Sequence, residues 1–434
     1  MLELDISHGL VPKEKLPRLL KKCASVLERM KGIVNAGGYA DPASFLNLPA
    51  DQTMLSNVKR VARTYKVDAV IVVGIGGPNL GTTAVQEAIQ GKLWNATEWT
   101  PKVFYADTVD PKNISDIVAI AESLLLQGKQ VLVNVITKSG TTTETIANAQ
   151  LFIQLLATHG KEPQDWLVVT TDKDSKLWQW AQQHNITVLE IPGNVVGRYS
   201  VLSPVGLFPL AVAGIDVDQL VAGAREMRNR CLEEQGPAAI TAAHLYFHHR
   251  DGKKIHDTFI FSTDLEALGK WYRQLMAESL GKRQNLSRKV VHAGMTPTAS
   301  TGTTDLHSMG QLYLGGPSDK FTTFVTLNKE KKDPVVPTTK GFDQLVQNIQ
   351  GKSLGTIRNA IFEGVATSYA KNKLPFVSVK LAHRNEKSIG AFLQFKMMEI
   401  MILGNLWNVN PFDQPEVESY KKHARERLAK MQRF

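Results

Sequence analysis

The stretch Val131–Thr145, VLVNVITKSGTTTET, indicates both a class of fold and a binding function. It begins as a β-branched run, which favours a buried strand, and Glu144 begins a helical pattern. Between them, Thr137–Thr143 contains four threonines, a serine, a glycine and a lysine. Hydroxyls and free N–H groups at a helix N-terminus donate to anions, and the helix dipole and a lysine favour negative charge. We therefore predict a phosphate-binding loop, with an ordinary polar turn capped by Thr or Ser as the alternative.

The same order of strand and helix recurs on both sides of this loop. In a first series we expect strands at Ala69–Val73, Lys102–Ala106, Val131–Ile136, Trp166–Thr170 and Thr187–Glu190. In a second series we expect strands at Lys254–Phe261, Lys289–His292, Phe321–Leu327 and Phe376–Lys380. Helical segments separate these strands, which is typical of a doubly wound parallel sheet. The sequence therefore predicts an α/β protein with two such units in tandem.

Helical regions complete this organisation. The start of the chain alternates helical patches, such as Lys13–Met30, with loops, and predicts a helical lead-in. Leu202–Asp216 is apolar and helical and predicts a hinge between the two units, and a helical C-terminus follows Gly390. We therefore expect three parts, a lead-in and two domains, at residues 1–48, 49–207 and 208–434.

The composition is that of a globular protein in a reducing compartment. The chain has 434 residues, of which 43% are hydrophobic and 21% charged, and it is long enough for two domains. Cys23 and Cys231 lie far apart and form no metal or redox pattern. The first residues, MLELDISHGL, lack the basic and apolar regions of a signal peptide, and the apolar run Met397–Leu403 predicts a buried helix. We therefore expect a cytoplasmic protein with no membrane partner.

The net charge of +10 raises the alternative of a nucleic-acid-binding protein. The basic residues are scattered, however, and only the tail KKHARERLAKMQRF, residues 421–434, concentrates them. That tail predicts a solvated terminal helix. We therefore expect no nucleic-acid partner, and a positive field of this kind is suited to attracting a phosphorylated small molecule.

A glycine-rich turn, GIGGPNLG at residues 74–81, follows the first expected strand. A dinucleotide fingerprint needs glycine at the position of Asn79, and Pro78 removes a backbone donor, so we expect no NAD here. Glycines such as Gly77 instead let a ligand approach the backbone closely.

Two segments carry side chains suited to moving protons and stabilising charge. A helix is expected over Asp264–Leu280, with Asp264 as its N-cap, and Gln274 and Glu278 share one face of it. Such a pair can abstract a proton and orient a hydroxyl, although most helical glutamates are solvated. Arg198 follows Gly197 and indicates either a positioned cation or a salt bridge between domains.

Several histidines and a C-terminal pair have weaker signals. His307 follows a Gly/Thr loop at the start of an expected helix, where a structural or exposed role is the alternative. Gln414 and Lys421 are seven apart and are expected on one face of a helix after Pro411. A histidine cluster has no carboxylate or cysteine at ligand spacing and predicts a helix surface, not a metal site. Its members are His244, His248 and His249.

Taken together, these segments resemble the phosphoglucose isomerase family, which is built from two sugar-isomerase domains. The resembling motifs follow the family's order through nearly the whole chain. They are GIGGPNLG (74–81), TKSGTTTET (137–145), VGRYSVLS (196–203), QLMAESLGK (274–282), DLHS and QL (305–312), and NPFDQPEVESYKK (410–422).

The resemblance implies reversible isomerisation of glucose 6-phosphate and fructose 6-phosphate through an enediolate, in glycolysis and gluconeogenesis and without metal or cofactor. Glu278 is then the base that moves a proton between C2 and C1, with Gln274 beside it. Arg198 and the backbone of Gly197 stabilise the enediolate. The implied ligands of the sugar phosphate lie at Gly77, Thr137, Lys138, Ser139, Thr142 and, nearby, Gln414.

The family also implies a ring-opening step, in which His307 and Lys421 manage the proton on the ring oxygen. The histidine comes from the neighbouring subunit, so a homodimer with shared active sites is implied. Three positions depart from the family's motifs, since Pro78 replaces a serine and Val196 and Glu416 each replace a glycine. We expect weaker phosphate binding at Pro78 or a divergent bacterial-type branch.

Two other functions stay open at this stage. An isomerase of another sugar phosphate, such as mannose 6-phosphate, would use the same residues. A sugar-phosphate sensor without catalysis is also compatible with such domains, although the sequence shows no helix-turn-helix segment and retains Glu278, His307 and Lys421 together.

Overall fold

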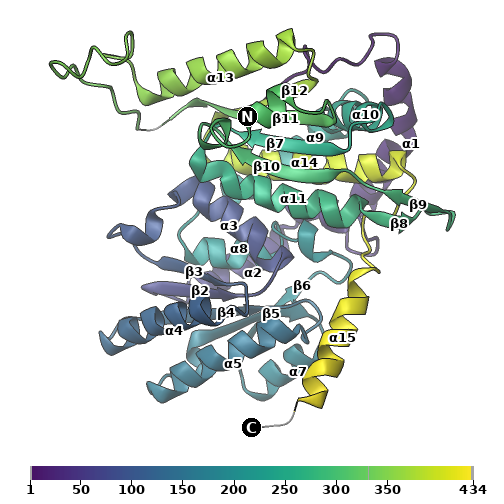
Figure 1. The fold of residues 1–434 in the computed structure, drawn as a ribbon. Coiled ribbons are helices and arrows are strands. Elements are labelled where there is room, and N and C mark those ends of the chain that lie inside the picture. Colours follow the sequence, from purple (N-terminus) through teal and green to yellow (C-terminus); the bar gives the residue numbers. More distant parts are fainter. Residues whose placement is uncertain (1, 331, 432–434) are drawn as a thin grey trace.

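Two five-stranded sheets form the structure, a computed structural model that describes residues 2–330 and 332–431. The sheets lie one above the other in Figure 1, with helices between them and on their outer sides. The α/β fold class and its parallel sheets, expected from the alternation of strands and helices, are confirmed.

The first sheet is entirely parallel and has the order β3-β2-β4-β5-β6. All five of its strands coincide with expected ones to within two residues at each end. They are β2 (Ala69–Val73), β3 (Lys102–Ala106), β4 (Val131–Ile136), β5 (Leu167–Asp172) and β6 (Thr187–Ile191). The helices of this half are α2 (Gln52–Ala62), α3 (Gly77–Gln90), α4 (Pro111–Leu126), α5 (Thr143–Thr158), α6 (Pro163–Trp166), α7 (Lys176–Gln183) and α8 (Pro204–Val212).

Helices cover both faces of this sheet, as buried apolar strands such as β2 require. In β2, Ile71 and Val73 pack with residues of α4 and α5. The alternate residues Val70 and Val72 pack on the other face, in one cluster with residues of α3 and α8. Because side chains alternate along a strand, these five fully buried residues serve two separate cores.

The second sheet has the order β1-β12-β11-β7-β10, and all its pairs are parallel except β1 with β12. Its strands are β1 (Leu2–Asp5), β7 (Ile255–Ile260), β10 (Thr296–Thr301), β11 (Lys320–Lys329) and β12 (Phe376–His383). The expected helical lead-in was therefore wrong at its start, where β1 extends this sheet. Lys13–Met30 does correspond to a helix, α1 (Leu16–Ala36).

One expected strand of the second series lies outside this sheet. Lys289–His292 corresponds to β9 (Val290–Ala293), which pairs antiparallel with β8 (Lys282–Gln284) in a two-stranded hairpin. The place beside β7 belongs instead to β10, which the sequence analysis did not identify. Its sequence, TPTAST, lacks the large apolar residues that mark a buried strand.

The helices of the second half divide between the two faces of its sheet. One cluster joins β7, β11 and β12 to the helices α9 (Val217–Cys231), α10 (Pro237–Arg250), α11 (Glu266–Leu280) and α14 (Glu386–Leu406). On the other face, aromatic residues of the same strands meet α12 (Gly310–Gly315) and α13 (Leu354–Lys371). Helix α14 is long and apolar enough to span a bilayer, but 89% of its most apolar window is buried, as expected for a core helix.

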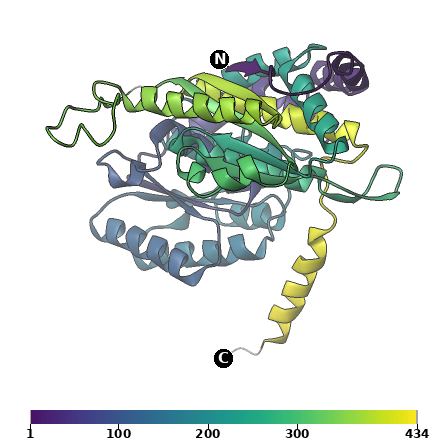
Figure 2. The ribbon, with the colours of Figure 1, turned by 45° about the horizontal axis from the view of Figure 1, so that its top comes forward.

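Helices α3 and α11 pack against each other between the sheets, so the two halves meet there (Figure 1). The last helix, α15 (Val417–Lys430), has no buried residue and extends away from the sheets in Figure 2. The expectation of a solvated terminal helix is confirmed for Lys421–Lys430, and residues 432–434 lie outside the described part.

Candidate functional site

The order of the first sheet creates a place for a ligand between β2 and β4. These strands are neighbours, but the chain leaves β2 toward β3 on one side and leaves β4 toward β5 on the other. Ligands of open α/β sheets bind at such a switch point, beyond the carboxyl ends of the strands. Here the ends of the two strands are paired at Val73 and Val135. A turn that starts at Gly74 follows β2, and a loop that starts at Thr137 follows β4.

The loop after β4 presents hydroxyls and free backbone donors. Thr137 is buried, and its hydroxyl lies 2.8 Å from that of Thr142. Thr142 occupies the N-cap of α5, but its side chain does not cap the helix. The first N–H groups of α5 therefore have no side-chain cap and, with the exposed Ser139, form a candidate anion site.

Lys138 links this loop to a neighbouring segment of the chain. Its Nζ donates to the carbonyl oxygens of Gly193 at 2.7 Å and Val195 at 2.9 Å. Burial lowers the pKa of this lysine. The ammonium therefore ties the loop to the segment that leads to Arg198, and its expected contact with a sugar phosphate stays a prediction.

The glycine turn after β2 connects this loop to the reactive side chains. Gly76 has φ +67°, and a Cβ there would lie 2.9 Å from Nε2 of Gln274. A Cβ on Gly77 would lie 2.3 Å from the carbonyl carbon of Gly197. Only glycine allows this approach, so the first turn of α3 lies directly against the Gly197–Arg198 peptide.

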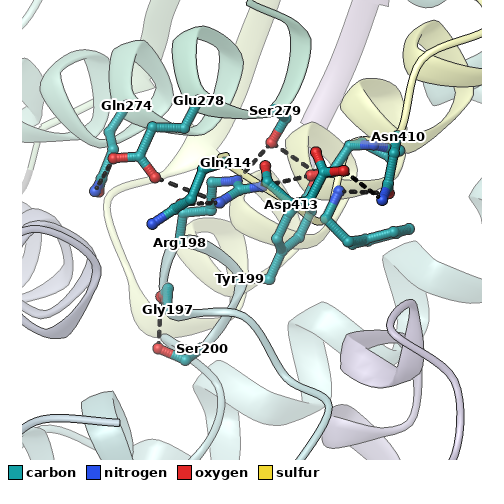
Figure 3. A network of polar contacts seen from close by, with 12 residues as sticks. Gly197, Arg198, Tyr199, Ser200, Gln274, Glu278, Ser279, Asn410, Asp413 and Gln414 are labelled. Atoms are coloured by element: carbon teal, nitrogen blue, oxygen red, sulfur yellow. Dashed lines mark hydrogen bonds and ion pairs between the residues drawn. The ribbon is translucent and has the colours of Figure 1, made fainter. Parts of the chain in front are cut away.

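Arg198, whose side chain is fully buried, is the centre of a polar network (Figure 3). Its Nε donates to Ser279 at 2.8 Å, and its Nη1 donates to Gln414 at 2.6 Å and to Glu278 at 3.4 Å. Its Nη2 donates to the carbonyl oxygens of Pro411 at 2.7 Å and Asp413 at 3.1 Å. The guanidinium thus joins α11 to the segment before α15. Arg198 therefore links segments that are distant in sequence, as expected from the salt-bridge alternative. It also faces the Glu278 carboxylate, as expected from the alternative of a positioned cation.

Glu278 and Gln274 lie side by side on α11, as their spacing predicts. Gln274 Nε2 donates to Oε1 of Glu278 at 3.0 Å, while Arg198 contacts the other carboxylate oxygen. The Glu278 side chain is 32% exposed, so a ligand can reach it. Oε1 of Gln274 is buried without a hydrogen-bond partner among the described residues.

The sequence analysis missed a second buried cation. Lys282 donates to the carbonyl oxygens of Glu278 at 2.6 Å and Asp413 at 2.7 Å, and it forms an ion pair with the Asp413 carboxylate. Burial, followed by the charge of Arg198, lowers the pKa of Lys282. Its place at the end of QLMAESLGK was the available signal, because a lysine just past a helix C-terminus can bind the last carbonyls.

The C-terminal candidates do not share a helix face. Gln414 lies in the turn before α15 and contacts Arg198, whereas Lys421 lies on α15 and pairs with Glu418 at 2.8 Å. The expected single face was wrong because the helix begins only at Val417. Within this chain the structure brings Gln414 into the site and does not bring Lys421 there.

His307 also lies apart from the Arg198 network within one chain. His307 is exposed and follows the short 3-10 turn Thr304–Leu306 after β10. The helix α12 begins only at Gly310, so the expected position of His307 at a helix start was wrong. Asp264 was wrongly expected to cap α11, since that helix has no side-chain cap and Asp264 pairs with Arg384.

The histidine cluster lies in α10 and was wrongly expected on a helix surface. His244 and His248 are buried, and Nε2 of His248 lies 2.7 Å from the carbonyl oxygen of Gly9. The described residues contain no group of three or more potential metal ligands.

The three departures from the family motifs fit the local backbone. Pro78 lies in the first turn of α3, where a backbone N–H would form no hydrogen bond within the helix. Val196 has φ −78° and ψ 145°, an ordinary extended conformation. Glu416 precedes α15 and is exposed.

A family comparison covers most of the chain. The sequence model described as phosphoglucose isomerase matches residues 53–433. A curated relative from Rubrobacter xylanophilus, named glucose-6-phosphate isomerase, is 33% identical over 96% of this chain and 94% of its own length. A protein of the same name from Thermus thermophilus is 33% identical over 95% of this chain and 97% of its own.

Solved structures have the same fold. A protein of Thermus thermophilus described as hypothetical superimposes with a TM-score of 0.87, at 32% identity, over 99% of this chain and 100% of its own. A glucose-6-phosphate isomerase from Chlamydia trachomatis gives a TM-score of 0.86 over 100% of this chain and 89% of its own. At 20% identity, the second match shows the fold alone.

Proposed function

Because this chain belongs to the phosphoglucose isomerase family, it is an aldose–ketose isomerase of glucose 6-phosphate and fructose 6-phosphate, and we propose how its residues carry out that reaction. The observation that supports the proposal is the position of Glu278. Its carboxylate lies between Gln274 and the buried Arg198. The glycine turn after β2 packs against Gln274 on one side and against the end of β4, before the hydroxyl-rich loop, on the other.

The loop after β4 is the proposed anchor for the sugar phosphate. Thr137, Ser139 and Thr142 donate hydroxyls, and the N-terminus of α5 donates N–H groups along a favourable dipole. Lys138 adds positive charge from the rim of the loop, and the close backbone at Gly77 completes the cradle. Binding at this remote end holds C1 and C2 in place, so part of the binding energy serves positioning.

Glu278 is the proposed base for the transfer between C2 and C1. It takes the C2 proton of the open-chain aldose, and an enediolate forms. The same carboxyl then returns this proton to C1, and the proton of the C2 hydroxyl passes to O1, which gives the ketose. A carboxylate in reach of both carbons performs both steps, and general acid–base catalysis typically contributes about 10²–10⁴-fold. Gln274 orients it through the 3.0 Å hydrogen bond, and its half-buried side chain contacts the sugar beside the base.

Arg198 is the proposed electrostatic partner of the enediolate. It is held by Ser279, Gln414 and backbone carbonyls, so its guanidinium does not reorganise as oxygen charge develops. The N–H groups of the adjoining Gly197 segment support the same charge. Such preorganised donors are worth several kcal/mol in a site from which water is excluded.

His307 and Lys421 are the proposed ring-opening groups, and their positions support a homodimer. His307 is exposed in the second half, and Lys421 lies on the projecting helix α15. A second copy that supplies His307 would complete each site. Mixing Glu278→Gln with His307→Ala protein tests this, because restored activity in mixed dimers requires shared sites and no restoration contradicts them.

We place this enzyme in the cytoplasm, because a reducing environment agrees with its two free, buried cysteines, Cys23 and Cys231.

The test of the function is a coupled assay with fructose 6-phosphate, run beside mannose 6-phosphate as the competing substrate. Turnover of fructose 6-phosphate that disappears in Glu278→Gln supports the assignment. Binding without turnover would support the sensor instead.

A further inference from the structure

We propose that Asp257, together with Thr298, Ser300 and Tyr313, is a positioning group that holds His307 in place for ring opening. The inference rests on the proposed role of His307. It concerns residues that do not touch the Arg198 network and that the sequence analysis did not single out.

Asp257 lies in the middle of β7 with no exposed surface. One of its carboxylate oxygens, Oδ1, accepts hydrogen bonds from Thr298 at 2.6 Å, Ser300 at 2.9 Å and Tyr313 at 3.2 Å. The hydroxyls of Ser300 and Tyr313 are themselves 2.8 Å apart. A single buried oxygen therefore joins three side chains from two further elements.

These three side chains flank the segment that carries His307. Thr298 and Ser300 belong to β10, which enters this segment, and Tyr313 belongs to α12, which follows it. Both ends of the His307 segment are thus fixed to the same carboxylate on β7, the strand next to β10. A displacement of β10 relative to α12 would therefore lengthen a hydrogen bond to Asp257.

Asp305 closes the segment internally. One of its carboxylate oxygens accepts from the backbone N–H of Thr301 at 2.7 Å, and the other accepts from the Ser308 hydroxyl at 2.8 Å. His307 lies next to Ser308 and follows the 3-10 turn directly. The histidine itself is exposed, so its position depends on these anchors rather than on packing around its ring.

The surroundings of Asp257 are costly for a carboxylate. The same face of the sheet is an aromatic cluster, in which Tyr313 packs edge-on against Phe259 with ring centroids 6.0 Å apart. Burial raises the pKa of Asp257, and its Oδ2 has no hydrogen-bond partner within the described chain. Apolar residues would pack there at lower cost, but they would not fix the register of β10 and α12 as directional hydrogen bonds do.

The test compares a cyclic and an acyclic substrate. Fructose 6-phosphate needs ring opening, whereas 5-deoxyfructose 6-phosphate lacks the hydroxyl that closes the ring and keeps the same spacing from phosphate to C1. We expect Tyr313→Phe and Ser300→Ala to lower kcat for fructose 6-phosphate by about tenfold or more, since small misplacements of a catalytic group are costly. Exchange of the C1 proton of the deoxy substrate with solvent deuterium stays within about twofold of the parent rate, because this step uses Glu278 and not His307.

Two controls keep the inference separate from the proposed function. Tyr369→Phe removes another buried phenol of the same cluster and leaves both rates near those of the parent protein. His307→Ala should slow only the cyclic substrate, and adding Tyr313→Phe to it should cause no further loss. Equal slowing of both substrates by His307→Ala overturns the role of His307. If His307→Ala behaves as expected but Tyr313→Phe slows both substrates equally, or neither, the positioning inference is wrong.

Discussion

The exchange of Arg198 for lysine tests whether the buried fork of donors, rather than positive charge alone, supports catalysis. Arginine makes five hydrogen bonds here, to Ser279, Glu278, Gln414 and the carbonyl oxygens of Pro411 and Asp413. A lysine has three donors on one nitrogen, so at least two of these contacts are lost.

The structure allows the size of this effect to be worked out. A hydrogen bond to a charged group contributes about 1.5–3 kcal/mol, so losing two of them removes about 3–6 kcal/mol of local stabilisation. Lys282 still binds the Asp413 carbonyl, which lessens the loss there. If about 3 kcal/mol of this reaches the transition state, kcat/KM for fructose 6-phosphate falls roughly 10²-fold.

The assay measures kcat and KM for fructose 6-phosphate and the urea midpoint of unfolding for the same variant. We expect most of the loss in kcat, because Arg198 contacts the base and not the phosphate loop. Arg29→Lys is the matched control, since the Arg29 side chain is 51% exposed and pairs with Asp41 at the surface. An Arg198→Lys protein with kcat within threefold of the parent would refute the reasoning, because charge alone would then suffice.

Other predictions concern the base, the glycine turn and the buried titratable groups. Glu278→Gln should abolish exchange of the C2 proton with deuterium while the affinity for inorganic phosphate, measured by calorimetry, stays within about twofold. Gly77→Ala should lower kcat/KM, and it should lower the free energy of unfolding in urea by about 1–3 kcal/mol, because the new Cβ would lie 2.3 Å from the carbonyl carbon of Gly197. Lys396→Met should lower the free energy of unfolding by about 3–5 kcal/mol in the same experiment, because it leaves the buried Glu399 carboxylate without its ion-pair partner. Burial lowers the pKa of His248 to about 4, from the usual value of 6.5. The unfolded chain therefore binds a proton that the folded protein does not, so stability should fall as the pH drops from 6.5 to about 4, less steeply in His248→Phe.

Each of these predictions has an outcome that contradicts it. Exchange that persists in Glu278→Gln, or a parent-like Gly77→Ala, would mean that the base or the close approach was misassigned. Lys112→Met is the control for the buried lysine, because the Lys112 side chain is 81% exposed and its ion pair is worth at most about 1 kcal/mol. Equal costs for the two lysine variants, or the same pH slope with and without His248, would remove the basis for the last two predictions.

Local patterns predicted the first sheet well and the second less well. The strands around Val131–Ile136 are β-branched, buried on both faces and bounded by turns, so their pattern identifies them without knowledge of their neighbours. β10 is polar and β1 precedes a long helical stretch, so neither has such a pattern. Their pairing with β7 and β12 depends on contacts with residues far away in sequence.

The candidate site divides in the same way. The hydroxyl-rich loop after β4, the glycine turn and the spacing of Gln274 and Glu278 follow from periodicity and helix geometry, which act within a few residues. The anchoring of Lys138 on carbonyls, the buried Lys282 and the Asp257 group were not predictable, because each joins segments separated by many residues. Local physics sets which side chains share a strand end or a helix face, whereas the directions of long side chains depend on the donors and acceptors that folding brings within about 3 Å of them.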